Sequence, residues 1–397
     1  MTTQPQTLLA HAKPRSSVLT TGLALFAMFF GAGNLIFPIL IGKTVGNQAW
    51  YAIFGLGITA VLVPFLGLAS MVLFQGKAIP FFGRLGKIPG FALFLLLQLI
   101  LGPLGVIPRL LTLMHATIKP YLFDISLPIF SVLICGVIFA CSFKRDSLIR
   151  LIGMFLTPVK LLSLGALIFL GIWGAETLNP NEVTPQESFS AGFLGGYNTM
   201  DLIAAFVFAT LILPHFEKEA TYGSPSERRR AVTKKMFGSS LIAAGLLFAT
   251  YVGLAWVASF HAWTFDLSFP PEEMLGAIAY KILGPIGACI AMVAVTFACL
   301  TTAITLSSTF AEYLEKDLSG KKIKSNWALI ATLATAALFA NLKFSGILAF
   351  LAPILQVVYP GLILLSLLNI LYSIYGFRMV KTPMAIAFLV GLIAYFL

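Results

Sequence analysis

The amino-acid sequence predicts an all-α polytopic membrane protein. Hydrophobic residues make up 59% of its 397 residues, whereas charged residues make up only 10%. A water-soluble fold of this composition lacks the polar residues needed to cover its surface, so a lipid bilayer is the environment that the chain fits. The apolar residues also fall into stretches of roughly 20, the length that an α-helix needs to cross the hydrocarbon core.

Eleven apolar stretches are candidates for membrane-spanning helices. The stretches 276–313 and 345–375 exceed one crossing, so we expect them to be tilted, broken or extended beyond the bilayer. Residues 1–17 are expected to form an uncleaved cytoplasmic tail, because the stretch after them is too long and irregular for a signal-peptide core. The expected spans are 18–42, 50–75, 91–116, 127–143, 149–174, 192–214, 236–260, 276–313, 327–342, 345–375 and 380–397.

Basic residues predict the orientation of these spans, because lysine and arginine concentrate in cytoplasmic loops. With the N-terminus in the cytoplasm of the cell, 20 of the 26 basic residues fall in cytoplasmic segments. The opposite loops contain only Lys43, Lys119 and Lys343. Orientation in the cell membrane therefore explains the net charge of +11, and no nucleic-acid partner is expected.

The first span contains a polar, glycine-rich interruption at residues 31–34 (GAGN), with apolar residues on both sides. An interruption at mid-depth leaves backbone groups without intrahelical partners, which is tolerated where protein or a bound solute satisfies them. The first span therefore predicts a substrate or ion site.

The sixth span opens with a second flexible, polar stretch at residues 192–201 (GFLGGYNTMD) and then continues as an apolar run. Five spans separate the two interruptions, so the two helices enter the membrane from opposite sides. Paired interrupted helices in two inverted halves point to the binding site of a transporter. The alternative is that Gly195 and Gly196 only permit close helix packing. The polar residues that accompany both interruptions favour a site.

Hydroxyl side chains form a stripe on the eighth span, at Thr301, Thr302, Thr305 and Ser308. Their spacing places them on one face of a helix. Hydroxyl and carbonyl oxygens are suitable ligands for a hard cation such as sodium. The alternative is that the hydroxyls bond back to carbonyls of their own helix.

Two of these motifs resemble one known family. Residues 30–38 (FGAGNLIFP) and 196–201 (GYNTMD) closely resemble the branched-chain amino acid:cation symporter family of the amino acid-polyamine-organocation superfamily. The resemblance runs from about residue 17 to residue 375 and implies the leucine-transporter fold, with two inverted five-helix repeats.

The implied organisation places helices 1–5 of the first repeat at 18–174 and helices 6–10 of the second repeat at 192–375. An additional eleventh helix follows at 380–397. Relatives usually have a twelfth helix, so its absence bears on oligomerisation or lipid contacts more than on transport.

The resemblance also implies binding residues. The Gly31 and Gly33 amides are expected to receive the carboxylate of the substrate, and Asp201 either pairs with the ammonium or a cation, or caps the following half-helix. The implied substrate-binding residues are Phe29, Gly31, Ala32, Gly33, Asn34, Tyr197, Asn198, Thr199, Asp201 and Thr302. The implied sodium ligands are Ala27, Phe30, Ala298, Thr301 and Thr302.

Three basic residues, Arg109, Lys160 and Lys281, fall inside predicted spans. In some proton-coupled relatives a fifth-helix lysine replaces the sodium, so Lys160 is a candidate for proton coupling. The alternative is that Lys160 reaches lipid headgroups or backbone carbonyls. Arg109 follows a proline-broken part of the third span and is expected to pair with carbonyls or a carboxylate; no function is assigned to it.

The sequence therefore predicts a secondary transporter in the cell membrane that imports leucine, isoleucine and valine with a coupled cation. Sodium is favoured over the proton, because both hydroxyls of the sodium site are present. Alternatives are a carrier of another small apolar amino acid such as methionine, and a membrane amino-acid sensor or channel. No cofactor and no enzyme activity are expected, because the spans contain neither a metal-ligand cluster nor a nucleophile with a paired base.

Overall fold

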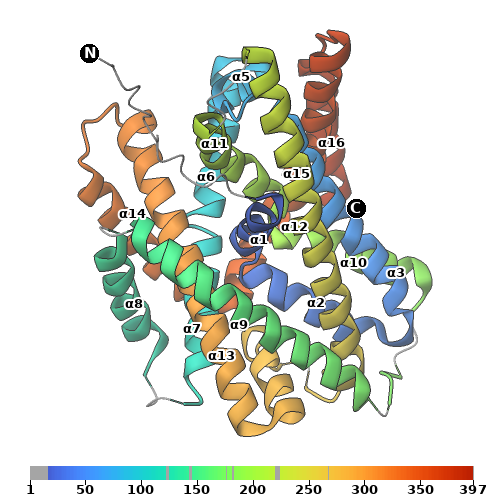
Figure 1. Ribbon diagram of the computed structural model, residues 1–397. Helices are drawn as coiled ribbons and strands as arrows, with labels where there is room; N and C mark the ends of the chain where they lie inside the picture. The colour runs from blue at the N-terminus through green and yellow to red at the C-terminus, as the bar shows by residue number, and fades with distance from the viewer. Residues whose placement is uncertain are drawn as a thin grey trace, which may run out of the picture.

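The chain folds into a bundle of α-helices, shown by a computed structural model in Figure 1. The structure describes residues 17–121, 125–142, 145–175, 177–180, 183–219, 224–266 and 268–396, and these residues contain no β-strand. The expected tail therefore lies outside the described residues, apart from Ser17, which caps α1. The α-helices are α1 (Val18–Phe29), α2 (Ala32–Val45), α3 (Ala49–Gly57), α4 (Val63–Leu73), α5 (Ala78–Phe82), α6 (Lys87–Leu101), α7 (Val106–Ile118), α8 (Leu127–Ser142), α9 (Arg145–Trp173), α10 (Pro185–Thr199), α11 (Asp201–Glu219), α12 (Pro225–His261), α13 (Pro271–Tyr313), α14 (Ser325–Ala340), α15 (Lys343–Tyr375) and α16 (Lys381–Phe396).

Helices occupy every one of the eleven predicted spans. In the described part of the chain, six helical stretches are long and apolar enough to cross a membrane, and five shorter apolar helices accompany them. The long span 276–313 is broken near its start, where Gly284 has a φ of 67° and Pro285 follows. This left-handed conformation favours glycine, which has no Cβ. The other long span is the continuous helix α15, of 33 residues.

The interrupted first span lies in the interior of the bundle. Figure 1 shows α1 at the centre, with α14 on the left and α3 and α16 on the right, while α9 crosses the view diagonally below it. Almost every residue of α2 is buried, and α2 packs against α12 and α10. Side chains and backbone near the interruption are therefore shielded from lipid, as non-helical backbone inside a membrane protein must be.

Small residues bring α10 unusually close to α3. A Cβ added to Gly192 would lie 1.9 Å from the Ala52 carbonyl oxygen, and one added to Gly196 would lie 1.9 Å from Thr59 Oγ1. Thr59 Oγ1 in turn donates a hydrogen bond to the Phe193 carbonyl at 2.8 Å. The glycines of the sixth span therefore serve close helix packing, the alternative that the sequence left open.

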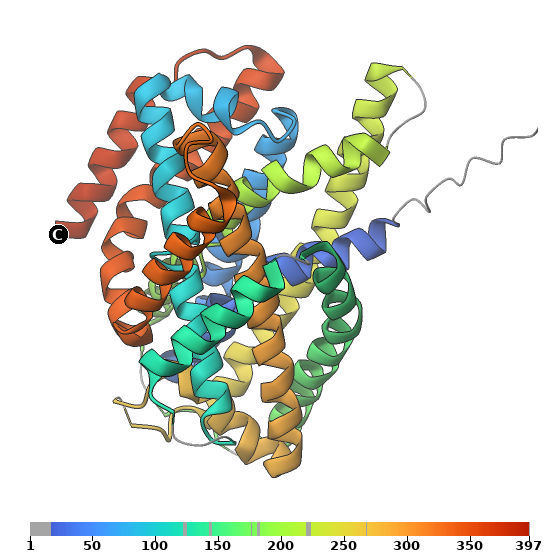
Figure 2. The same cartoon turned by 90° about the vertical axis from the view of Figure 1, so that its left-hand side faces the viewer.

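The last helix lies at the edge of the bundle. Figure 2 shows α16 on the outside, and it packs against α15. Gly391 faces the backbone of α15, because a Cβ there would lie 2.9 Å from the Val357 carbonyl oxygen. The division into repeats over 18–174 and 192–375 stays a prediction.

Candidate functional site

The two interrupted helices meet at their breaks. α1 ends at Phe29 and α2 begins at Ala32, while Met200 separates α10 from α11 with a φ of 63°. A Cβ on Gly33 would lie 3.1 Å from Thr199 Cα, so backbone contacts backbone at this point. The second break is shorter than the sequence predicted, because α10 continues through the glycines to Thr199.

A hydrogen-bonded cluster joins the breaks. Asn34 Nδ2 donates to both carboxylate oxygens of Asp201 at 2.9 Å, and the Tyr251 hydroxyl donates to Asp201 Oδ2 at 2.7 Å. Asn34 Nδ2 also contacts the Tyr251 hydroxyl. All three side chains are buried. Asp201 is thus held by partners on α2 and α12, at the first position of α11.

The same cluster changes the expected role of Gly31. Its amide was expected to be free for a substrate carboxylate, but it donates to Asn34 Oδ1 at 2.8 Å. Asn34 therefore uses its two polar atoms to connect the break of the first span to the carboxylate of Asp201. In this conformation the Gly31 amide has a protein partner, and a carboxylate must displace Asn34 to use it.

A cavity opens between the breaks and is lined by residues of α1, α2, α6, α7, α10, α11 and α13. Its volume is about 20 Å³, room for roughly one water molecule. An amino acid therefore requires side chains or half-helices to move apart. Eight of the ten predicted substrate residues line it, namely Phe29, Gly31, Ala32, Gly33, Asn34, Thr199, Asp201 and Thr302.

The other two predicted residues do not line the cavity. Tyr197 stacks on Tyr359 with ring centroids 4.5 Å apart. Asn198 Nδ2 donates to the Leu194 carbonyl of its own helix at 3.3 Å. Both side chains therefore serve contacts beside the site.

Sequence reasoning missed most of the apolar wall of the cavity. Ala204 and Phe208 lie three and seven residues after Asp201, and Leu306 lies four residues after Thr302. This helical spacing puts them on the same faces as the polar residues and was the signal that could have identified them. Tyr251 was also missed; its signal was a lone tyrosine in an apolar span.

The implied sodium ligands lie on α1, at residue 30 and on α13. Thr301 Oγ1 and Thr302 Oγ1 donate to the Ala298 carbonyl at 2.8 Å and 3.0 Å. This is the back-bonding that the sequence left as an alternative. It does not remove the lone pairs of the hydroxyl oxygens, which remain available to a cation. Ala27 lies in the last turn of α1, and Phe30 is the residue that follows the end of this helix.

Lys160 lies between α1 and α13. Its Nζ is 4.4 Å from the ring centroid of Phe30 and 5.3 Å from that of Phe26, and it is within electrostatic reach of Cys299. The residue is only 2% exposed, so the alternative that it reaches lipid headgroups is wrong. Cys299 lies about one helical turn before Thr302, one of the implied sodium ligands.

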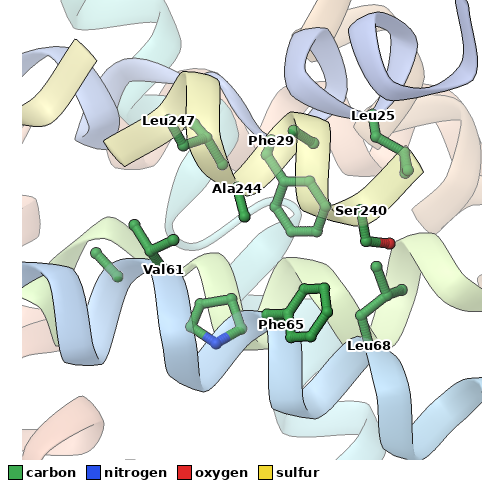
Figure 3. A pocket seen from close by; sticks show the side chains of 11 residues that line it. Leu25, Phe29, Val61, Phe65, Leu68, Ser240, Ala244 and Leu247 are labelled. Atoms are coloured by element: carbon green, nitrogen blue, oxygen red, sulfur yellow. The ribbon is translucent and has the colours of Figure 1, made fainter. Parts of the chain in front are cut away.

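A second pocket lies on the other side of Phe29. Figure 3 shows the Phe29 ring among Leu25, Phe65 and Leu247, with Ser240 as the one labelled polar side chain. Such a lining offers little to the charged groups of an amino acid. The cavity that contains Asp201 is therefore the better candidate site.

Comparisons with known proteins assign the chain to a family. The family model for branched-chain amino acid transport proteins matches residues 14–396. The chain belongs to this family. Its members are membrane permeases, so the chain is an integral membrane protein and not an enzyme.

Curated members of the family match most of the chain. The branched-chain amino acid permease BrnQ of Bacillus subtilis is 30% identical over 91% of this chain and 82% of its own length. BrnQ of Escherichia coli is 29% identical over 97% of this chain and 88% of its own length.

Solved structures show the fold. The inward-facing conformation of Mhp1 is similar with a TM-score of 0.66 at 14% identity, over 96% of this chain and 88% of that chain. A Na⁺-coupled sialic acid symporter is similar with a TM-score of 0.55 at 12% identity, over 96% of this chain and 88% of that chain. This family member therefore has the leucine-transporter-type fold that the sequence resemblance implied.

Replacing Gly33 with leucine is expected to lower leucine binding by roughly tenfold to hundredfold, if the bound ligand must overpack against the new side chain at a cost of about 1–3 kcal/mol. Its Cβ would press on the Thr199 backbone, and the longer side chain would enter the cavity. Gly31→Leu is expected to fill the cavity in the same way, whereas Gly31→Ala has room for its Cβ. Leucine binding to purified variants measures the effect.

The control for this prediction is Gly245→Leu, because a Cβ at Gly245 meets no atom within 4 Å. This variant should insert into the membrane and bind leucine as the unmodified protein does. Normal binding by Gly33→Leu and Gly31→Leu would remove the proposed site.

Proposed function

We propose that the protein is a secondary transporter that imports leucine, isoleucine and valine together with a cation. The observation that supports this most directly is the meeting of two interrupted helices at a cavity that contains a buried carboxylate, Asp201. Such breaks supply polar backbone and half-helix dipoles in the middle of a membrane protein, where amino acids and ions bind in transporters. The substrate class is taken from the curated relatives, which are branched-chain amino acid permeases.

The cavity offers separate surfaces to the two ends of such a substrate. Phe29, Phe208 and Leu306 form an apolar wall for a branched side chain. Asp201 and the backbone at Gly33 lie at the polar end, where the ammonium and carboxylate would bind. Alternating access then requires the half-helices at the breaks to rock around this site, with the N-terminus on the cytoplasmic side.

The coupled cation has two candidates. Sodium is supported by the hydroxyls of Thr301 and Thr302, whose oxygens retain lone pairs. The proton is supported by Lys160, whose buried ammonium lies between α1 and α13. A fixed positive charge at this place disfavours a sodium ion there, since like charges within several Å repel strongly where the dielectric constant is low. The position of Lys160 therefore shifts the weight toward the proton.

Uptake into liposomes tests the proposal. Two experiments impose a sodium gradient alone and a proton gradient alone. In at least one of them, purified protein should accumulate radiolabelled leucine saturably against the leucine concentration gradient. Isoleucine and valine should compete with leucine. Stronger competition by methionine would replace the substrate assignment, flux that only equilibrates leucine would indicate a channel, and binding without uptake would indicate a sensor.

A further inference from the structure

Arg109 is a buried arginine whose guanidinium is incompletely bonded. It lies near the start of α7 and is 2% exposed. Nη1 donates to the Asn198 carbonyl at 2.9 Å, whereas Nε and Nη2 are buried and have no hydrogen-bond partner in the part of the chain that the structure describes. Phe37 and Phe344 hold the guanidinium from the sides, with their ring centroids 5.5 Å and 5.4 Å from its central carbon.

The charge of Arg109 also lacks a counter-ion. No carboxylate oxygen of the described residues lies within 4.0 Å of the guanidinium. Asp201 lines the same cavity, but its oxygens accept from Asn34 and Tyr251. A buried guanidinium loses the favourable interaction with water and normally regains it from an anion. The aromatic rings and one carbonyl regain only part of it.

We propose that Nε and Nη2 of Arg109 bind the carboxylate of the amino-acid substrate. The inference rests on the proposed function and extends it, because it assigns the carboxylate to a side chain in addition to the backbone of the first span. Arg109 lines the cavity together with Asp201, so one cavity presents a cation and an anion that are not paired with each other. This arrangement complements a zwitterion, whose carboxylate would meet Arg109 and whose ammonium would meet Asp201.

The geometry of the guanidinium suits a carboxylate. Nε and Nη2 form one edge of the planar group, and an edge with two parallel N–H donors matches the two oxygens of a carboxylate. Nη1 is anchored to the Asn198 carbonyl, at the end of α10 and beside the second break. A carboxylate on Arg109 is thereby connected to the interruption in the sixth span. Binding of the substrate carboxylate would then act directly on the half-helices next to the second break, which must move during transport.

The experiment compares leucine with leucinol, which has the same side chain and ammonium but no carboxylate. Binding of each is measured with purified full-length protein, for the unmodified chain, Arg109→Gln and Arg109→Lys. The unmodified protein should prefer leucine by about 100-fold, and Arg109→Gln should lose most of this preference, because its leucine affinity falls much more than its leucinol affinity. Arg109→Lys keeps the charge but not the two-donor edge and should retain part of the preference.

Arg84→Gln is the matched control, because Arg84 lies away from the cavity and bonds to the Leu368 carbonyl on α15. It should leave the ratio of leucine to leucinol affinity unchanged. A second measurement uses only the unmodified protein, so it tests the proposal even if the Arg109 variants do not fold. Phenylglyoxal modification of the unmodified protein, mapped by mass spectrometry, should be slowed at Arg109 by leucine but not by leucinol, and at Arg84 by neither.

The possible outcomes separate this inference from the proposed function. Failure of the unmodified protein to bind leucine would overturn both. A preference for leucine that persists in Arg109→Gln, or equal protection of Arg109 by leucine and leucinol, would overturn the role of Arg109 alone. Leucine binding that needs chloride in the unmodified protein, but not in Arg109→Gln, would show that a chloride ion occupies the guanidinium and would also overturn it.

Discussion

Replacing Asp201 with alanine is expected to abolish leucine uptake. The substitution leaves the Asn34 amide and the Tyr251 hydroxyl without their acceptor inside the protein. Removing one partner of a buried, charged hydrogen-bonded group costs about 2–5 kcal/mol, which corresponds to a loss of at least about 30-fold. Initial rates of leucine uptake into liposomes, corrected for the amount of inserted protein, measure the effect.

Asp201→Asn separates the two roles of this residue. It preserves size and one acceptor oxygen but removes the charge. Uptake should collapse if the carboxylate pairs with the substrate ammonium or a cation, and should largely survive if it only caps α11. We expect collapse, because Asp201 lines the cavity.

Asp317→Asn provides the matched control, since this aspartate is exposed and lies after α13. It should transport leucine at the unmodified rate. Unmodified transport by both Asp201→Asn and Asp201→Ala would leave neither role standing.

Replacing Lys160 with methionine is expected to abolish uptake that is driven by a proton gradient. Methionine keeps much of the length and the apolar contacts with Phe26 and Phe30, but it removes the group that can carry a proton. Uptake is measured in liposomes without sodium, with the pH difference across the membrane varied. Binding of leucine at equal pH on both sides should be retained, since Lys160 does not line the cavity.

The paired experiment replaces both Thr301 and Thr302 with alanine. Under proton coupling, this double variant should not become dependent on sodium. Under sodium coupling, it should raise the sodium concentration needed for half-maximal uptake, and Lys160→Met should have only a mild effect. Sodium-driven uptake that survives in Lys160→Met, together with no uptake in a pure proton gradient, would reject the proton.

The sequence predicted the positions of the helices well, because the signals are local. The length of an apolar run indicates whether a helix can cross the membrane, independently of how the rest of the chain folds. The interruption at residues 31–34 was also predicted, and the structure places it between Phe29 and Ala32. The break itself falls at Phe30 and Gly31, whereas Gly33 and Asn34 already belong to α2.

The second interruption shows where local signals fail. Its glycines suggested a flexible stretch, yet α10 is helical through Gly196 and breaks at Met200 instead. Because Gly192 and Gly196 have no side chains, α10 can pack closely against α3 and against the residues 58–62 that follow it. The sequence does not distinguish a glycine that breaks a helix from a glycine that allows another helix to pack closely, because the difference depends on whether another helix lies beside it in the folded protein.

The sequence by itself determined that the chain is a helical membrane protein with two interrupted spans, and its motifs identified most residues that line the cavity. The tertiary structure decided which polar groups are satisfied there. Asn34 is 167 residues from Asp201, and Tyr251 is 50 residues from it, so no local pattern could pair them. The same holds for the open donors of Arg109 and the position of Lys160. A hydrogen bond or a buried charge depends on groups that only folding brings together, whereas apolar length and helix breaks are properties of one stretch of chain.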